Sequence, residues 1–185
     1  MYPLRIHRAA SCLRRGGVIA YPTEGVWGLG CDPFNEDAVR KLLLIKQRPL
    51  EKGLILVAGS MKQLEPLLKT LNSAQMKLLT ESWPGPVTWL LPDPDQLIPT
   101  WIKGKFTSVA IRVSAHPPVV QLCSVFGGLI VSTSANPAAL LPARTRLRVL
   151  TWFDDSLDYI VPGRLGGQHG PSAIHDLASA NVIRS

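Results

Sequence analysis

The chain has 185 residues, of which 46% are hydrophobic, and a formal net charge of +7. This length favours one domain with a sizeable core, and no run of 18 apolar residues is present that would predict a membrane span. The positive charge favours a polyanion such as RNA, or an anionic small substrate, as the partner, although the sequence contains no RNA-binding signature motif.

Residues 5–15 are predicted to form an amphipathic helix and not a signal peptide, because arginines interrupt the apolar residues at helical spacing. The three cysteines, Cys12, Cys31 and Cys123, are scattered and form no CxxC pair. We therefore expect buried or free thiols in a reducing compartment such as the cytosol. The four histidines show no metal-binding spacing, so no structural metal is expected.

Helical and strand patterns alternate along the rest of the chain, which is typical of α/β architecture. Helices are predicted over residues 35–48, with Asn35 as the N-cap, and over 60–68, 73–83, 117–127 and near 145–150. Strands are predicted over residues 17–22, 53–58, 86–92, 108–113 and 128–132, and near 158–161 and 172–176. Some connections carry too little helix for a regular parallel crossover, so we expect an open, twisted, mixed sheet with flanking helices.

The first candidate site follows the first predicted strand, where Thr23 and Glu24 precede glycines 25, 28 and 30. The glycine spacing is not GxGxxG and no helix begins at the last glycine, so a dinucleotide-binding site is not indicated. One interpretation is a tight irregular turn that needs positive φ. The other is that the glycines let a ligand approach the backbone beside the Thr23 hydroxyl. The residues alone leave both interpretations open.

A cluster of three basic residues and one separate arginine form the next two candidates. Lys46, Arg48 and Lys52 lie within seven residues, at a helix end and in the loop after it. Cations there complement the helix dipole, but a cluster beside a core strand favours a clamp for a triphosphate. Arg112 lies within an apolar strand and must be paired if it is buried. Its partner is either an internal carboxylate such as Glu24 or the carboxylate of a ligand.

The segment VSTSAN, residues 131–136, ends a predicted core strand in four polar side chains. A turn or a helix cap explains one or two of them. Ligands of open α/β sheets bind beyond the carboxyl ends of strands, so these groups indicate contacts to phosphate or ribose. The segment GGQHGPSAIHD, residues 166–176, offers Ser172 after several glycines, although a flexible loop is the simpler interpretation.

The chemistry that these candidates suggest is positioning and charge stabilisation around a nucleotide. The sequence has no evident Ser-His-Asp set, no carboxylate pair and no thiol in a reactive context. A hydrolase with a covalent nucleophile is therefore not indicated.

The segments PTEGVWGLGCD, KQRP followed by KGLIL, WPGPVTWLL, SVAIRVSAHP, VSTSAN and PSAIHD occur in this order in the YrdC-like family. The chain resembles that family from about residue 5 to 177. The specific signature is KxR with SxN, here Lys46-Gln47-Arg48 and Ser134-Ala135-Asn136, which a paralogue group on the same fold lacks. The resemblance implies one YrdC-like domain over residues 1–185, with an open, twisted α/β sheet around a deep basic cavity.

The resemblance also implies an activity in the cytoplasm. L-threonine, bicarbonate and ATP, with Mg²⁺ on the triphosphate, would give threonylcarbamoyl-AMP and pyrophosphate. The product would pass to threonylcarbamoyl-transfer proteins that modify tRNA at the adenosine next to the anticodon. The implied threonine-binding positions are Thr23, Arg112, Ser132 and Ser172. The implied ATP-binding positions are Lys46, Arg48, Lys52, Ser108, Ser134 and Asn136, of which Lys46, Arg48, Ser134 and Asn136 form the catalytic set.

The sequence departs from the family at two places. Pro137-Ala138-Ala139 stands where many members continue with Ser-Gly, which leaves the shape of the local loop open but not the SxN itself, and Lys52 stands where many have asparagine. Two other functions are compatible with the sequence. One is a module whose basic cavity holds tRNA or double-stranded RNA without catalysis. The other is a carbamoyl-adenylate enzyme with a different acceptor, as in the related domain of hydrogenase maturation proteins.

Overall fold

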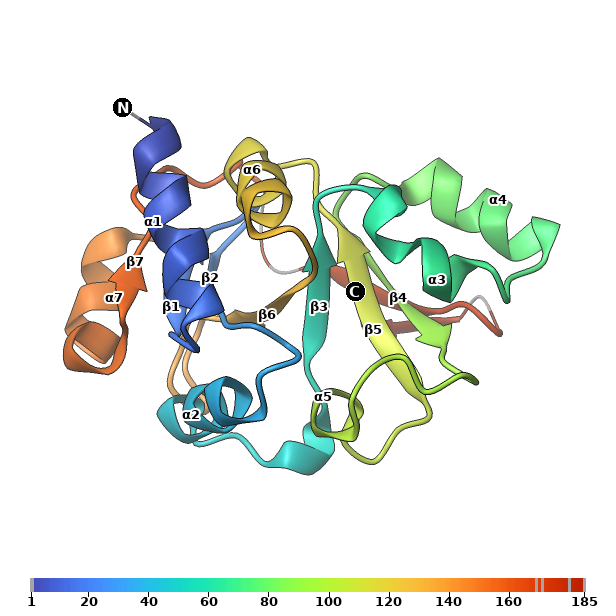
Figure 1. Ribbon diagram of the computed structural model, residues 1–185, viewed down its shortest axis with the longest axis horizontal. Helices are drawn as coiled ribbons and strands as arrows, with labels where there is room; N and C mark the ends of the chain where they lie inside the picture. The colour runs from blue at the N-terminus through green and yellow to red at the C-terminus, as the bar shows by residue number, and fades with distance from the viewer. Residues whose placement is uncertain (1, 169, 171, 180, 185) are drawn as a thin grey trace.

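The computed structural model describes residues 2–168, 170, 172–179 and 181–184. Figure 1 shows a sheet that runs through the molecule, with helices packed against it. Within the described residues the sheet has nine strands in the order β7-β1-β2-β6-β3-β5-β4-β8-β9. Their bounds are β1 Ile19–Pro22, β2 Trp27–Gly30, β3 Ile55–Ala58, β4 Val87–Pro92, β5 Ser108–Val113, β6 Ile130–Ser134, β7 Tyr159–Ile160, β8 Ala173–Asp176 and β9 Val182–Arg184.

The sheet contains both parallel and antiparallel strand pairs. β3 pairs parallel with β5, while β6 pairs antiparallel with both β2 and β3. The sequence prediction of a mixed α/β sheet is therefore confirmed. The helices are α1 Tyr2–Arg14, α2 Glu36–Lys46, α3 Glu65–Leu68, α4 Ser73–Ser82, α5 Thr100–Lys103, α6 Pro117–Phe126 and α7 Arg146–Phe153, and short 3-10 turns cover Leu50–Lys52, Met61–Leu64 and Asp154–Ser156.

The helices form two layers because each strand alternates the side chains of its two faces. α1 and α6 lie side by side on one face (Figure 1). There the predicted apolar stripe of α1 is buried with Val57 and Ile130 of the sheet, which confirms the amphipathic helix. On the opposite face Leu56 and Ile111 belong to the larger core, together with residues of α2, α4 and α5. None of the described helices has the length and apolar character needed to cross a membrane.

Helix α2 is bounded by local signals that the sequence carries. The Asn35 side chain accepts a hydrogen bond from the backbone N–H of Ala38 at 3.1 Å, as predicted for an N-cap. The helix ends at Gln47, whose φ of 48° is left-handed. The predicted helix over residues 35–48 was therefore two residues too long at its C-terminal end. This early end separates Lys46, on the last helical turn, from Arg48, which lies beyond it.

The glycine segment after β1 corrects one prediction. Residues 27–30 form β2, antiparallel to β1, where a turn with positive φ was one interpretation. Glycines 25, 28 and 30 do not have positive φ. A Cβ on Gly30 would lie 2.4 Å from the Val131 carbonyl oxygen, so this glycine permits close packing of β2 in the sheet.

Four further elements differ from the sequence prediction. Residues 60–68 begin as a 3-10 turn and only their last part, α3, is α-helical. The predicted strand over residues 128–132 lies two residues later, as β6, so that its hydroxyl groups belong to the sheet itself. Strand β9 and helix α5 were not predicted. The predicted glycine-rich link over residues 163–171 includes positions 169 and 171, which lie outside the described residues.

The cysteines lie in the apolar interior. Cys12, Cys31 and Cys123 are all buried and form no disulfide, as predicted. Burial is the largest cause that raises the pKa of Cys123, to about 12, so this thiol stays protonated at neutral pH.

Candidate active site

A hollow of about 230 Å³ opens beside the part of the sheet that α1 and α6 leave uncovered. It is lined from the β1–β2 turn, β5, β6, the start of β8 and β9. Six of the ten predicted site residues line it: Thr23, Arg48, Arg112, Ser132, Ser134 and Ser172. Segments far apart in the sequence therefore meet where the sequence motifs placed a ligand.

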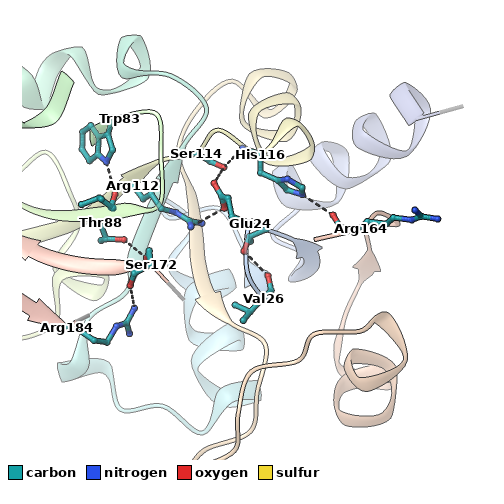
Figure 2. Close-up of polar contacts among 12 residues, drawn as sticks. Glu24, Val26, Trp83, Thr88, Arg112, Ser114, His116, Arg164, Ser172 and Arg184 are labelled. Carbon is teal, nitrogen blue, oxygen red and sulfur yellow. Dashed lines mark hydrogen bonds and ion pairs between the residues drawn. The ribbon is translucent and has the colours of Figure 1, made fainter. Parts of the chain in front are cut away.

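Arg112 forms an ion pair with Glu24 at one end of the hollow (Figure 2). Arg112 Nη1 lies 3.1 Å from Glu24 Oε2, and the two side chains are 8% and 12% exposed. The internal carboxylate that the sequence analysis named as one partner of Arg112 is therefore in place. Arg112 Nε is buried and finds no hydrogen-bond acceptor in the described part of the chain. Arg112 as a residue also lines the hollow.

A chain of hydrogen bonds holds Glu24 from behind, as Figure 2 shows. Ser114 Oγ donates to Glu24 Oε1 at 2.6 Å, and the backbone N–H of His116 donates to Ser114 Oγ at 3.1 Å. The His116 Nε2 lies 3.1 Å from the Arg164 carbonyl oxygen. Burial is the largest cause that lowers the pKa of His116, which favours its neutral form. The carboxylate is thus fixed at its Oε1 and faces Arg112 with its Oε2.

The segment after Arg164 closes over the β1–β2 turn. The backbone N–H groups of Gly166 and Gln168 donate to the carbonyl oxygens of Thr23 and Glu24, both at 3.0 Å. A Cβ on Gly25 would lie 2.0 Å from the Gly170 carbonyl oxygen. Only glycine fits at position 25, and the reason is this close approach and not a positive φ.

Ser172 and Arg184 complete the wall on the β8 side. Ser172 Oγ lies 2.7 Å from the buried Thr88 hydroxyl, and Arg184 donates to the Ser172 carbonyl oxygen at 2.8 Å. The sequence analysis did not name Arg184, which lines the hollow from β9. The only sequence signal was a basic residue after two apolar ones, and such a pattern is too common to indicate a site.

Arg48 enters the hollow from the loop after α2. Its guanidinium donates to the Gly53 carbonyl oxygen at 2.9 Å and to the Lys52 carbonyl oxygen at 3.3 Å. Burial, and then the charge of Arg184, lower the pKa of Arg48. No salt bridge to a carboxylate is formed by Arg48 or Arg184 within the described ranges. This end of the hollow therefore carries net positive charge.

Lys46 lies behind the SxN segment and not on the lining of the hollow. Its ammonium donates to the carbonyl oxygens of Ser134 and Asn136 and, at 3.1 Å, to Asn136 Oδ1. Ser134 Oγ also donates to Asn136 Oδ1, at 2.6 Å. Burial, with a smaller contribution from Arg48, lowers the pKa of Lys46 to about 8. The predicted pair KxR and SxN is thus brought together, with the lysine as a brace for the loop.

Two predicted residues lie elsewhere. Lys52 is exposed and does not line the hollow. Ser108 lines a separate, more open hollow of about 720 Å³, beside the buried ion pair of Lys103 and Asp93. In the segment Pro137-Ala138-Ala139, Ala139 has a φ of 65°, a left-handed conformation that glycine adopts more easily.

This arrangement defines a class of protein, an open α/β sheet that holds an arginine-lined hollow. The chain belongs to the Sua5/YciO/YrdC family, whose sequence profile, described as telomere recombination, matches residues 11–185. The YrdC-like resemblance is therefore confirmed.

Two relatives of high sequence identity carry the same name. The threonylcarbamoyl-AMP synthase of Cellvibrio japonicus is 52% identical to this chain over 97% of the chain and 95% of the relative. The protein of the same name from Pseudomonas paraeruginosa is 56% identical over 97% and 96%.

Solved structures share the fold. P. abyssi Sua5 complexed with L-threonine superposes with a TM-score of 0.88 at 31% identity, over 96% of this chain. The present chain spans 52% of that longer protein. E. coli YciO superposes with a TM-score of 0.83 at 23% identity, over 99% of this chain and 89% of YciO, which shows the shared fold alone.

Proposed function

We propose that the protein is a threonylcarbamoyl-AMP synthase, a nucleotidyltransferase that forms threonylcarbamoyl-adenylate from L-threonine, bicarbonate and ATP and releases pyrophosphate. The observation that carries the proposal is the hollow itself. It joins a buried arginine with an unused N–H, Arg112, to two arginines without carboxylate partners in the described chain, Arg48 and Arg184. An amino acid and a polyphosphate fit these two ends.

The threonine end is built from Arg112 and three hydroxyl-bearing residues, Thr23, Ser132 and Ser172. Arg112 Nε would donate to the α-carboxylate. Thr23 Oγ1 already donates to the Val26 carbonyl oxygen at 2.7 Å, so its free lone pairs would accept from the substrate. The complex of P. abyssi Sua5 with L-threonine, a relative of the same fold, supports threonine as the ligand.

The ATP end uses Arg48 and Arg184 as forks for phosphate oxygens, with the Ser134 hydroxyl between the two ends. Lys46 and Asn136 act as positioning residues for Ser134. Lys52 and Ser108, which lie off the hollow, are proposed as outer contacts of the same nucleotide. The Mg²⁺ that accompanies ATP would take most of its ligands from phosphate and water. The protein groups able to add a ligand are the hydroxyls of Ser132, Thr133 and Ser134.

The reaction needs positioning more than a protein nucleophile. The ammonium group of threonine first releases a proton to solvent, and its nitrogen then forms a bond to the carbon of bicarbonate with loss of water, which gives a carbamate. A carbamate oxygen then attacks the α-phosphorus of ATP. The bond from that phosphorus to the bridging oxygen breaks, and pyrophosphate leaves with the electron pair. The arginines stabilise the negative charge that this transfer spreads over the phosphate oxygens.

We further infer a single domain over residues 1–185 that acts in the cytoplasm. Its labile product would pass to threonylcarbamoyl-transfer proteins for tRNA modification. The net charge of +7 is compatible with direct contact to tRNA.

The test is pyrophosphate release from ATP and bicarbonate, measured with and without L-threonine. We expect release that requires L-threonine and is weak with serine. A protein that releases no pyrophosphate with any amino acid, but binds tRNA or double-stranded RNA with steep salt dependence, would be the noncatalytic RNA-binding module instead.

A further inference from the structure

The two ends of the hollow differ in how their positive charge is balanced. Arg48 and Arg184 donate to backbone carbonyl oxygens, which carry no net charge. Arg112 instead faces the carboxylate of Glu24 at 3.1 Å, in a pair that is almost fully buried. One end is therefore positive and the other is close to neutral before any ligand binds.

Glu24 cannot easily leave Arg112. Its Oε1 accepts from Ser114, and its backbone carbonyl accepts from Gln168. The next residue, Gly25, lies so close to Gly170 that no side chain fits between them. The carboxylate thus stays beside the guanidinium when a ligand enters, and its charge acts on the ligand.

The charge of the Arg112–Glu24 pair restricts the net charge of a ligand that binds beside Arg112. A simple carboxylate on Arg112 would share one guanidinium with Glu24, so two negative charges would contact a single buried cation, which is costly because desolvated charges need partners. An amino acid adds a carboxylate and an ammonium group together, so the sum with Glu24 and Arg112 stays at zero. The ammonium group also gains the attraction of the Glu24 carboxylate.

We propose that Glu24 is a specificity-determining residue, which makes the amino-acid end of the hollow select zwitterions over carboxylates that lack an α-ammonium group. The inference rests on the proposed function, because it assigns the substrate amino acid to the Arg112 end. It gives Glu24 a role that none of the sequence motifs assigned to it.

The experiment compares two ligands that differ only at the α-nitrogen, L-threonine and (R)-3-hydroxybutyrate. Isothermal titration calorimetry on the full chain gives the ratio of their dissociation constants for the unmodified protein and for Glu24→Gln. We expect threonine to bind much more tightly to the unmodified protein. We expect the ratio to narrow by about tenfold or more in Glu24→Gln, through weaker threonine and stronger 3-hydroxybutyrate binding.

Two control variants separate charge from structure. Ser114→Ala removes the hydrogen bond to Glu24 Oε1 but keeps the carboxylate, so we expect it to keep the preference for threonine. Glu65→Gln removes an exposed carboxylate from α3 and should leave both affinities unchanged. An unchanged ratio in Glu24→Gln, or an equal narrowing in Ser114→Ala, would overturn the proposal.

A third comparison needs no variant, so it holds even if Glu24→Gln does not fold. Equal affinity of the unmodified protein for the two ligands would overturn the role of Glu24. If that protein still releases pyrophosphate only with L-threonine, the synthase function stands and only the zwitterion inference fails. Absence of threonine-dependent release would instead remove the proposed function.

Discussion

The arginines that line the hollow have two kinds of partner, a carboxylate or backbone carbonyl oxygens. This difference matches two kinds of ligand, a zwitterion and a triphosphate. Arg112 is neutralised by a fixed carboxylate, whereas Arg48 and Arg184 are held by uncharged carbonyl oxygens. A neutralised cation still donates directional hydrogen bonds but adds little net field, which suits a zwitterion. Cations held by carbonyl groups keep their field, which suits a triphosphate. The charge that a site presents thus depends on the partners of its cations as much as on their number.

The largest expected effect, on both stability and threonine binding, comes from removing the cation of the Arg112–Glu24 pair. Arg112→Met leaves Glu24 buried without its cation, so the free energy of unfolding should fall by about 3–5 kcal/mol. The double variant Glu24→Gln/Arg112→Met should recover much of this loss, because no buried charge remains. Threonine binding should be absent in both. Urea denaturation and titration calorimetry measure the two effects.

A double variant that is no more stable than Arg112→Met would contradict the role of the ion pair. It would mean that the cost comes from lost packing of the arginine side chain and not from an unpaired carboxylate.

A smaller effect, on ATP affinity, is expected from removing Arg48 at the positively charged end of the hollow. Arg48→Ala should weaken ATP binding by about 10- to 100-fold, because a hydrogen bond to a charged group contributes about 1.5–3 kcal/mol. Threonine affinity without ATP should hardly change. The matched control is Arg40→Ala, which removes an exposed arginine of α2 that pairs with Glu36. Equal loss of ATP affinity in both variants would show a general charge effect and not a site at Arg48.

The smallest expected effect is the pH dependence of ATP affinity that arises from Lys46, the lysine that holds the loop at Ser134. The pKa of Lys46 is lowered to about 8, so its ammonium is protonated below this value and loses its proton as the pH rises through it. ATP affinity should therefore fall by up to about tenfold between pH 7 and pH 9, and binding near pH 8 should take up protons. Calorimetry in two buffers of different ionisation enthalpy measures that uptake. Lys46→Met should bind ATP more weakly at pH 7 and show no such uptake; uptake that persists in Lys46→Met would assign it to another group.

Much of the fold was predictable because its signals are local. The Asn35 cap and the helical pattern of α2 each act over a few residues, and the structure has both. β2 was missed because two of its four residues are glycine, which is depleted in strands. Its glycines are explained only by the neighbouring strand and by Tyr21, which approach them in the folded chain.

The candidate site was predictable in its composition but not in its pairing. The motifs named six residues that line the hollow, and they left the partner of Arg112 open. Arg184 was missed because its neighbours in the sequence are ordinary strand residues, while its neighbours in space are Ser172 and Arg48. Lys46 was assigned to the ligand, whereas the structure directs its ammonium to Ser134 and Asn136.

The sequence by itself determined the α/β class, the helix and strand positions with strong periodicity, and the family signature of KxR and SxN. Only the tertiary structure decided which cation is neutralised, which stays positive and which braces a loop. The physical reason is distance along the chain. Propensity and capping act between residues a few positions apart, whereas the bond from Ser114 to Glu24 joins residues 90 positions apart and that from Lys46 to Ser134 joins residues 88 apart. Such pairs form only when packing of the sheet brings their strands together.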